Sequence, residues 1–289
     1  MKTLQNIQFQ QFINLLLLVI VAFIHSKIQT TWSTIIILAI FASAIELGFS
    51  YHYRNKVFFP YSAIITSFGV ILMIGWTQWY IPYILTALAL SQKWLLKIDK
   101  GHLFNPSNLA VVLALAIFYP KALPIIGQLG REGYLTIIAI IALAIAILIR
   151  VNRIIIPIAF VLSYVALEYL LIGSTDPHWK IDDFITTFYS TSFIVYIFFM
   201  LTDPRVTPDN SYMQILFGLF VALFVAFLDY INGVHLRNLF IAVFFMSPAF
   251  IPLYRQMNGK DFQKYLFVLI LCVIIVVYVL SQSSRYFSM

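Results

Sequence analysis

Long, uninterrupted apolar runs follow one another along almost the whole chain. Of its 289 residues, 62% are hydrophobic and only 10% are charged. A water-soluble domain of this length cannot enclose so much apolar surface, so we expect a lipid bilayer to surround much of the chain. Because the runs are continuous and do not alternate with polar residues, they predict transmembrane helices rather than the strands of a membrane barrel.

Eleven of these runs are candidate helices in a bilayer, where a full crossing takes about 20 residues. They span residues 11–26, 32–50, 57–75, 79–97, 106–119, 133–150, 154–172, 185–201, 211–229, 236–252 and 264–281. The run 106–119 is short for a crossing, which indicates a tilted or broken helix. The linkers are too short to form a soluble domain. We therefore expect an all-α, polytopic fold with a single membrane domain over residues 1–289.

The basic residues predict an orientation in the membrane. The formal net charge is +7, and in so apolar a chain it indicates membrane topology rather than a nucleic-acid partner. If every segment crosses, twelve of the 18 Lys and Arg residues lie on the side that carries the N-terminus. Basic residues near helix ends favour the cytoplasmic side, so we expect a multi-pass protein with a cytoplasmic N-terminus and no nucleic-acid partner.

Two polar, turn-forming stretches indicate an internal duplication. Residues 101–108 (Gly-His-Leu-Phe-Asn-Pro-Ser-Asn) and 233–238 (Gly-Val-His-Leu-Arg-Asn) each lie between two apolar runs. The string 44–47 (Ala-Ile-Glu-Leu) resembles 166–169 (Ala-Leu-Glu-Tyr), and Thr-Ser-Phe occurs at both 66–68 and 191–193. The three matches follow the same order in both halves of the chain. A repeat of five spans has an odd number of crossings, so its second copy must be inverted in the membrane.

The duplication divides the chain into two repeats and one added segment. The first repeat covers 11–119, the second covers 133–252, and the last segment, 264–281, has no counterpart. We therefore expect about ten transmembrane helices as two inverted five-helix repeats, followed by one extra C-terminal transmembrane helix.

Glu46 and Glu168 lie inside apolar segments, where a carboxylate is costly. One interpretation is that they are symmetry-related acids on an ion or proton pathway at the centre of the bundle. The other is that each is protonated or hydrogen-bonded near a helix end and has only a structural role. Lys93 and Asp229 lie at segment ends, and we expect both at the membrane interface.

The stretch around Asn105 has the residue types that begin a helix. Asn105 and Asn108 supply side chains that cap free backbone amides, and Pro106 suits the first helical turn. A helix N-terminus inside a bundle presents N–H groups and a partial positive charge to an anion or to the polar edge of a ring. An ordinary capped helix start at the interface is the alternative.

A second break, Thr202-Asp203-Pro204, follows the eighth apolar segment. The Asp-Pro pair favours a rigid turn with a capping side chain. Arg205 comes next and is also consistent with a simple marker of the cytoplasmic face.

No motif of a known catalytic or metal centre occurs in the sequence. There is no Gly-rich phosphate loop, nucleophile elbow or HExxH pattern. Cys272 is the only cysteine and lies in an apolar run, so it predicts neither a disulfide framework nor a metal site. We assign no catalytic residue and no metal ligand, and these residues by themselves do not name a function.

Taken in order, several of these stretches resemble the RnfD/NqrB family. The first half has the run 60–66 (Pro-Tyr-Ser-Ala-Ile-Ile-Thr) and then 104–106 (Phe-Asn-Pro). The second half has 198–204 (Phe-Phe-Met-Leu-Thr-Asp-Pro) and then the Pro-containing run 242–253. Glu46 also lies where the family has a glutamate in its second helix. The resemblance covers nearly the whole chain apart from the last segment.

The resemblance implies a membrane subunit of an ion-translocating electron-transport complex in a bacterial inner membrane. It implies ten helices in two inverted repeats, and as partners the lipid bilayer and other electron-transport subunits. Members of the family carry flavin. The positions that the resemblance assigns to flavin binding are Thr66, Asn105, Pro106, Asn108, Thr202, Asp203 and Pro204.

The chain departs from the family where a flavin is commonly attached. The family esterifies FMN to a threonine in the loop between the fifth and sixth helices, but residues 119–131 contain no Ser or Thr. A phosphoester needs a hydroxyl, so we expect no covalent FMN at that loop. Ser67 also replaces a family glycine in the third helix. We therefore expect any flavin, FMN or riboflavin, to be bound non-covalently between the repeats.

Two other functions fit the same residues. Inverted repeats with interrupted helices are equally typical of small-molecule or ion transporters and channels, which would keep this fold without redox activity. A scaffold that anchors partner proteins through the segment 264–281 is a third interpretation.

Overall fold

The computed structural model describes residues 2–25, 30–98, 101–125, 134–174 and 190–284. The α-helices are α1 (Lys2–His25), α2 (Trp32–Arg54), α3 (Tyr61–Met73), α4 (Ile81–Leu95), α5 (Pro106–Ile117), α6 (Tyr134–Arg150), α7 (Ile155–Glu168), α9 (Thr191–Val195), α10 (Ser211–Asn232), α11 (Leu236–Tyr254) and α12 (Gly259–Ser284). Two π-helical turns, η2 (Tyr169–Gly173) and η3 (Tyr196–Met200), continue α7 and α9. Each predicted apolar segment contains one of these helices, which confirms the helical fold class.

Six helical stretches in the described chain are long and apolar enough to cross a membrane. They are Ile7–Ile24, Trp32–Arg54, Ile155–Gly173, Ser211–Asn232, Leu236–Tyr254 and Gly259–Gln282. Large apolar side chains such as Ile40, Leu162 and Phe267 point outward and are each more than half exposed. Apolar surface of this extent is favourable against lipid and unfavourable against water. The fold is that of a multi-pass helical membrane protein.

Several other helices are shorter than a crossing. α5 has 12 residues and is therefore about 18 Å long, against about 30 Å of hydrocarbon. α3 has 13 residues, and α9 with η3 spans only Thr191–Met200. The shortness expected for the segment 106–119 is confirmed, whereas ten full crossings remain a prediction.

Two small antiparallel ribbons lie where the sequence indicated only helices and linkers. β1 (Ile74–Trp76) pairs with β4 (Ala122–Pro124), so the extended chain after α3 contacts the chain that follows α5. β2 (Lys97–Ile98) pairs with β3 (Gly101–His102). This pairing lies a few residues before the start of α5.

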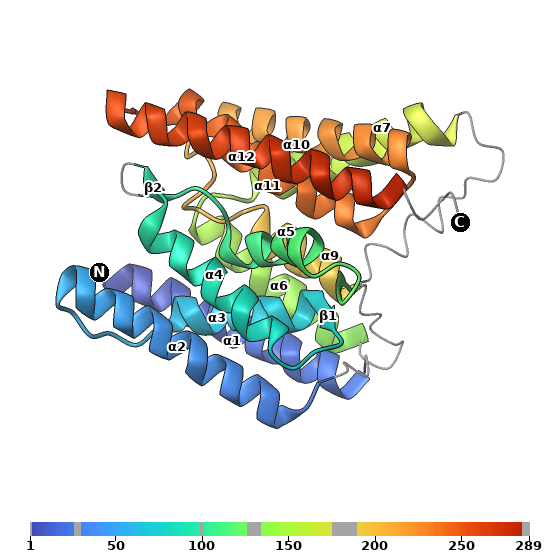
Figure 1. Cartoon of the computed structure of the whole chain (residues 1–289). Coiled ribbons are helices and arrows are strands. Elements are labelled where there is room, and N and C mark those ends of the chain that lie inside the picture. Colours follow the sequence, from blue (N-terminus) through green and yellow to red (C-terminus); the bar gives the residue numbers. More distant parts are fainter. Residues whose placement is uncertain (1, 26–29, 99–100, 126–133, 175–189, 285–289) are drawn as a thin grey trace.

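The helices are arranged in layers (Figure 1). α1 to α4 lie together on one side of the molecule, and α7, α10 and α12 lie on the other. α5, α9 and α11 occupy the space between them, where α5 packs on both α3 and α11. Two short helices, α5 and α9, are therefore central, together with the longer α11.

α5 and α11 cross at the centre of the molecule in opposite directions. The rings of Phe104 and Phe244 stack with their centroids 4.8 Å apart. Phe104 directly precedes the cap of α5, and four residues later in the chain the Asn108 side-chain amide donates to the Phe240 carbonyl at 3.2 Å. From the first contact to the second, the residue number rises by four on the α5 side and falls by four on α11. The two helices therefore run antiparallel.

Candidate ligand site

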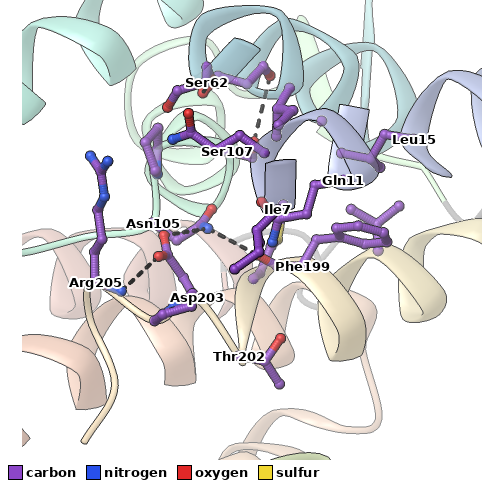
Figure 2. A pocket seen from close by; sticks show the side chains of 18 of the residues that line it. Ile7, Gln11, Leu15, Ser62, Asn105, Ser107, Phe199, Thr202, Asp203 and Arg205 are labelled. Atoms are coloured by element: carbon purple, nitrogen blue, oxygen red, sulfur yellow. Dashed lines mark hydrogen bonds between the residues drawn. The ribbon is translucent and has the colours of Figure 1, made fainter. Parts of the chain in front are cut away.

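A cavity of about 290 Å³ lies among the central helices on the side where α5 begins (Figure 2). Its wall comes from α1, α3, the start of α5, and η3 with the turn that follows it. Four stretches that are far apart in the sequence therefore meet at one place. A concave site with apolar walls and a few polar groups is the usual form of a small-molecule pocket.

Asn105 joins the start of α5 to the turn after η3. Its Oδ1 accepts the backbone N–H of Asn108 at 3.1 Å and so caps the helix. Its Nδ2 donates to the Phe199 carbonyl at 3.1 Å and to the Asp203 carboxylate at 3.0 Å. Pro106 occupies the first helical position, as the sequence indicated. The Asn-Pro pair thus starts the helix and fixes it against the second polar break.

Asp203 lies at the centre of a set of hydrogen-bond donors. Besides Asn105, its carboxylate accepts the backbone N–H of Arg205 at 3.0 Å and faces His102 Nε2 at 3.4 Å. Burial acts to raise the pKa of Asp203, but the hydrogen bond and charge of His102 and those of Arg205 outweigh it and lower the pKa to about 2. Asp203 is therefore ionised at neutral pH.

α3 supplies the opposite wall of the cavity. Thr66 is almost fully buried, and its hydroxyl donates to the Ser62 carbonyl at 2.9 Å. Gly69 lies against Ser107 on α5, so closely that a Cβ at this position would be 2.7 Å from the Ser107 Cβ and would overlap its hydroxyl. The glycine thus permits the close approach of α3 and α5 that shapes the cavity.

The structure brings together most of the predicted flavin-binding positions. Residues that line the cavity are Thr66, Asn105, Pro106, Thr202, Asp203 and Pro204. Asn108 lies outside the lining, because it is directed at Phe240 on α11. The loop 119–131, at which we expect no covalent FMN, is described only as far as residue 125.

Several lining residues were not predicted from the sequence. Gln8 and Gln11 come from α1, and Phe199 and Met200 come from η3. The two glutamines are three positions apart and so share one face of a helix, which is unusual at the start of an apolar segment. That polar face was the signal available in the sequence.

Glu46 lies outside the cavity in a buried ion pair. Its carboxylate is 2.9 Å from Lys93 Nζ, and the same ammonium group donates to the Ser62 hydroxyl at 2.9 Å. Lys93 is only 4% exposed, so protein encloses it although it lies at the end of an apolar segment. The pair joins α2 to α4 behind the cavity wall, because a charge buried in a bundle is stable only with a partner.

Glu168 also lies outside the cavity and is completely buried. It is next to Asp229 on α10, which is 2% exposed and is therefore enclosed by protein. The sequence placed Asp229 only at a segment end, because its partners Tyr164 and Asn238 come from other helices. In the described chain, no group of three His, Cys, Asp or Glu side chains is arranged to hold a metal ion.

A scan against models of protein families and a search of curated proteins both found no match for this chain. The geometry of the cavity and the sequence patterns therefore carry the functional argument.

Proposed function

We propose that this protein is an RnfD/NqrB-like membrane subunit of an electron-transport complex that binds a flavin non-covalently in the central cavity. The observation that carries the proposal is the convergence at the cavity. Thr66, the Asn105-Pro106 pair and the turn 202–204 were singled out from separate parts of the sequence, and all of them line one cavity.

The lining suits a planar ring system with one polar edge. Ile65, Val195 and Met200 offer apolar surface, and the Phe199 ring can contact an isoalloxazine face. The start of α5 offers a partial positive charge to the carbonyl-bearing edge. The volume is near the lower end of the range of about 300–1,000 Å³ for small-molecule sites, which favours one ring system over a dinucleotide.

Arg205 suggests where a phosphate would lie. Its side chain is exposed and extends from the turn that carries Asp203, at the rim of the cavity (Figure 2). Guanidinium groups bind phosphate through paired hydrogen bonds. FMN, which adds a phosphate to the riboflavin ring and side chain, would gain this contact.

The inverted duplication is also part of the proposal, and the helix contacts support it. In the first half α1 packs on α3, α2 on α4, and α4 on α5; in the second half α6 packs on η3, α7 on α10, and α10 on α11. The corresponding helices also contact one another, α1 with α6, α3 with α9, and α5 with α11. The antiparallel α5–α11 pair is what a twofold axis in the membrane plane would produce.

The visible spectrum of the purified protein tests flavin binding. The protein is purified in mild detergent, incubated with FMN or riboflavin, and separated from free flavin. We expect isoalloxazine absorbance to remain with the wild-type protein and to be largely lost in Asn105→Ala. Asn210→Ala is the matched control, because Asn210 caps α10 and lies outside the cavity. Wild-type protein without bound flavin under these conditions would refute the proposal.

The short central helices favour one alternative, a transporter or channel for a small molecule or ion. Helices that begin inside the bundle commonly build a binding site near the middle of a transporter. Solute uptake by proteoliposomes that is lost in Asp203→Asn, from protein without flavin affinity, would favour this function over electron transport.

A further inference from the structure

Glu168 and Asp229 form an acid pair that is buried in the second half, away from the cavity. Glu168 is fully buried and Asp229 is 2% exposed. Neither forms an ion pair with a Lys or Arg side chain in the part of the chain that the structure describes. Two carboxylates at one buried place repel each other and lose their hydration, so they cannot both be ionised without a bound positive charge.

The hydrogen bonds distinguish the two acids. Asp229 accepts the Tyr164 hydroxyl at 2.9 Å, the Asn238 amide at 2.6 Å and the backbone N–H of His235 at 3.4 Å. The Glu168 carboxyl lies beside Asp229 and the Tyr164 hydroxyl, but no described donor meets its oxygens in good hydrogen-bond geometry. Donors stabilise a carboxylate, whereas a carboxyl group without donors is more stable in its neutral form. Asp229 is therefore the fixed anion and Glu168 the protonated acid.

Other buried oxygens near the pair are also unpaired. The Asn238 amide that donates to Asp229 has no donor to its own Oδ1, and the Tyr196 hydroxyl has no partner in the described chain. Both side chains are fully buried, and Tyr196 is close enough to interact electrostatically with Asp229. Unsatisfied buried polar groups are rare and call for an explanation, and here they surround a pair of acids that has one proton to hold.

The remaining titratable groups that face the pair come from three elements. Tyr164 is on α7, Tyr196 is on η3, and His235 lies in the turn before α11. Arg237, in the first turn of α11, acts on His235. His235 is partly exposed, so it is the facing group nearest to solvent in the described structure.

We propose that Glu168 and Asp229 form a proton-binding site in which Glu168 holds one exchangeable proton and Asp229 remains ionised. The proton leaves the Glu168 carboxyl as hydronium and is regained from water, without a redox change. The site is separate from the cavity and does not depend on flavin. The corresponding glutamate of the first half, Glu46, is neutralised by Lys93 instead of by a proton.

Infrared spectroscopy of the purified full-length protein in detergent tests the site. At neutral pH we expect a carbonyl stretching band of a protonated carboxyl group in the wild type, which disappears as the pH is raised. The band should be lost in Glu168→Gln and shifted in Asp229→Asn. The double variant Glu46→Gln with Lys93→Met is the matched control and should leave the band unchanged, because it removes another buried carboxylate together with its partner charge.

Three results would overturn the proposal. The first is wild-type protein without a protonated-carboxyl band at neutral pH, and the second is a band that persists unchanged in Glu168→Gln. The third is loss of the wild-type band on addition of sodium chloride or calcium chloride at constant pH, which would make the pair a metal-cation site. The wild-type spectrum decides the first and third points even if a variant fails to fold.

Discussion

The residue that organises the cavity is Asn105, which contacts three partners with one side chain. It caps α5 through Asn108 and fastens that helix to Phe199 and Asp203. The cap was predictable, because Asn before Pro at a helix start is a local pattern. The contact with Asp203 joins residues 98 positions apart, which no local pattern specifies.

Asp203 should give the protein a distinct sensitivity to acid. Its pKa is about 2 in the folded protein, whereas an aspartate in an unfolded chain has a pKa of about 3.9. The lower folded value means that ionised Asp203 stabilises the fold above about pH 4, and this contribution is lost as the pH falls from about 4 to about 2. Thermal unfolding in detergent should show a larger loss of melting temperature over this window in the wild type than in Asp203→Asn. Equal losses would contradict the assignment.

Arg205 should distinguish two flavins. If its guanidinium binds a phosphate, Arg205→Ala should weaken FMN binding by about tenfold and leave riboflavin binding unchanged. The reason is that a charge-assisted contact contributes about 1.5–3 kcal/mol before solvent screening reduces it. Quenching of flavin fluorescence on titration with protein measures both affinities. Arg150→Ala is the control, since Arg150 is a basic residue on α6 outside the cavity. An equal effect on both flavins would show that Arg205 does not bind the phosphate.

At the scale of the helices, the approach of α3 to α5 depends on Gly69. A methyl group at this position would overlap Ser107, so Gly69→Ala should destabilise the protein by about 1–3 kcal/mol and reduce flavin binding. Gly48, in α2, has open space around it, and Gly48→Ala should be neutral or stabilising by up to about 1 kcal/mol. Thermal unfolding of the two variants makes the comparison. Similar stability of both would contradict the packing that we describe.

The buried ion pair between α2 and α4 should behave as a unit. Removal of one partner leaves an unpaired buried charge, and we expect Lys93→Met to cost about 3–5 kcal/mol. The double variant Glu46→Gln with Lys93→Met removes both charges and should recover most of that loss. Thermal unfolding of the single and double variants tests the coupling. Additive losses would mean that the two side chains do not depend on each other.

The helices could be predicted from the sequence far better than their side-chain partners. Apolar runs define helices by themselves, because each run satisfies its own backbone in lipid. Lys93 was placed at the interface because it ends an apolar run, and its partner Glu46 is 47 positions away. The β1–β4 ribbon was missed for the same reason, since β1 pairs with a strand that follows a different helix.

For the whole molecule, the two proposed repeats differ in how they accommodate a buried glutamate. One half neutralises its buried glutamate with Lys93, and the other pairs its glutamate with Asp229.

If the halves are inverted, the ends of α2 and α7 lie on opposite membrane faces. Cys272 is buried, so a Cys272→Ser background carrying Asn55→Cys or Ser174→Cys gives a clean labelling assay. We expect an impermeant reagent to label Asn55→Cys from the cytoplasmic side and Ser174→Cys from the other. Labelling of both from one side would contradict the inversion.

The central claim is that the cavity between the helix breaks holds the isoalloxazine ring of a flavin. An experimental density map of the protein purified with FMN tests it most directly. We predict planar density among Thr66, Asn105 and Phe199, with the phosphate toward Arg205. A map in which this cavity is filled by side chains or lipid, or in which the flavin lies elsewhere, would contradict the account.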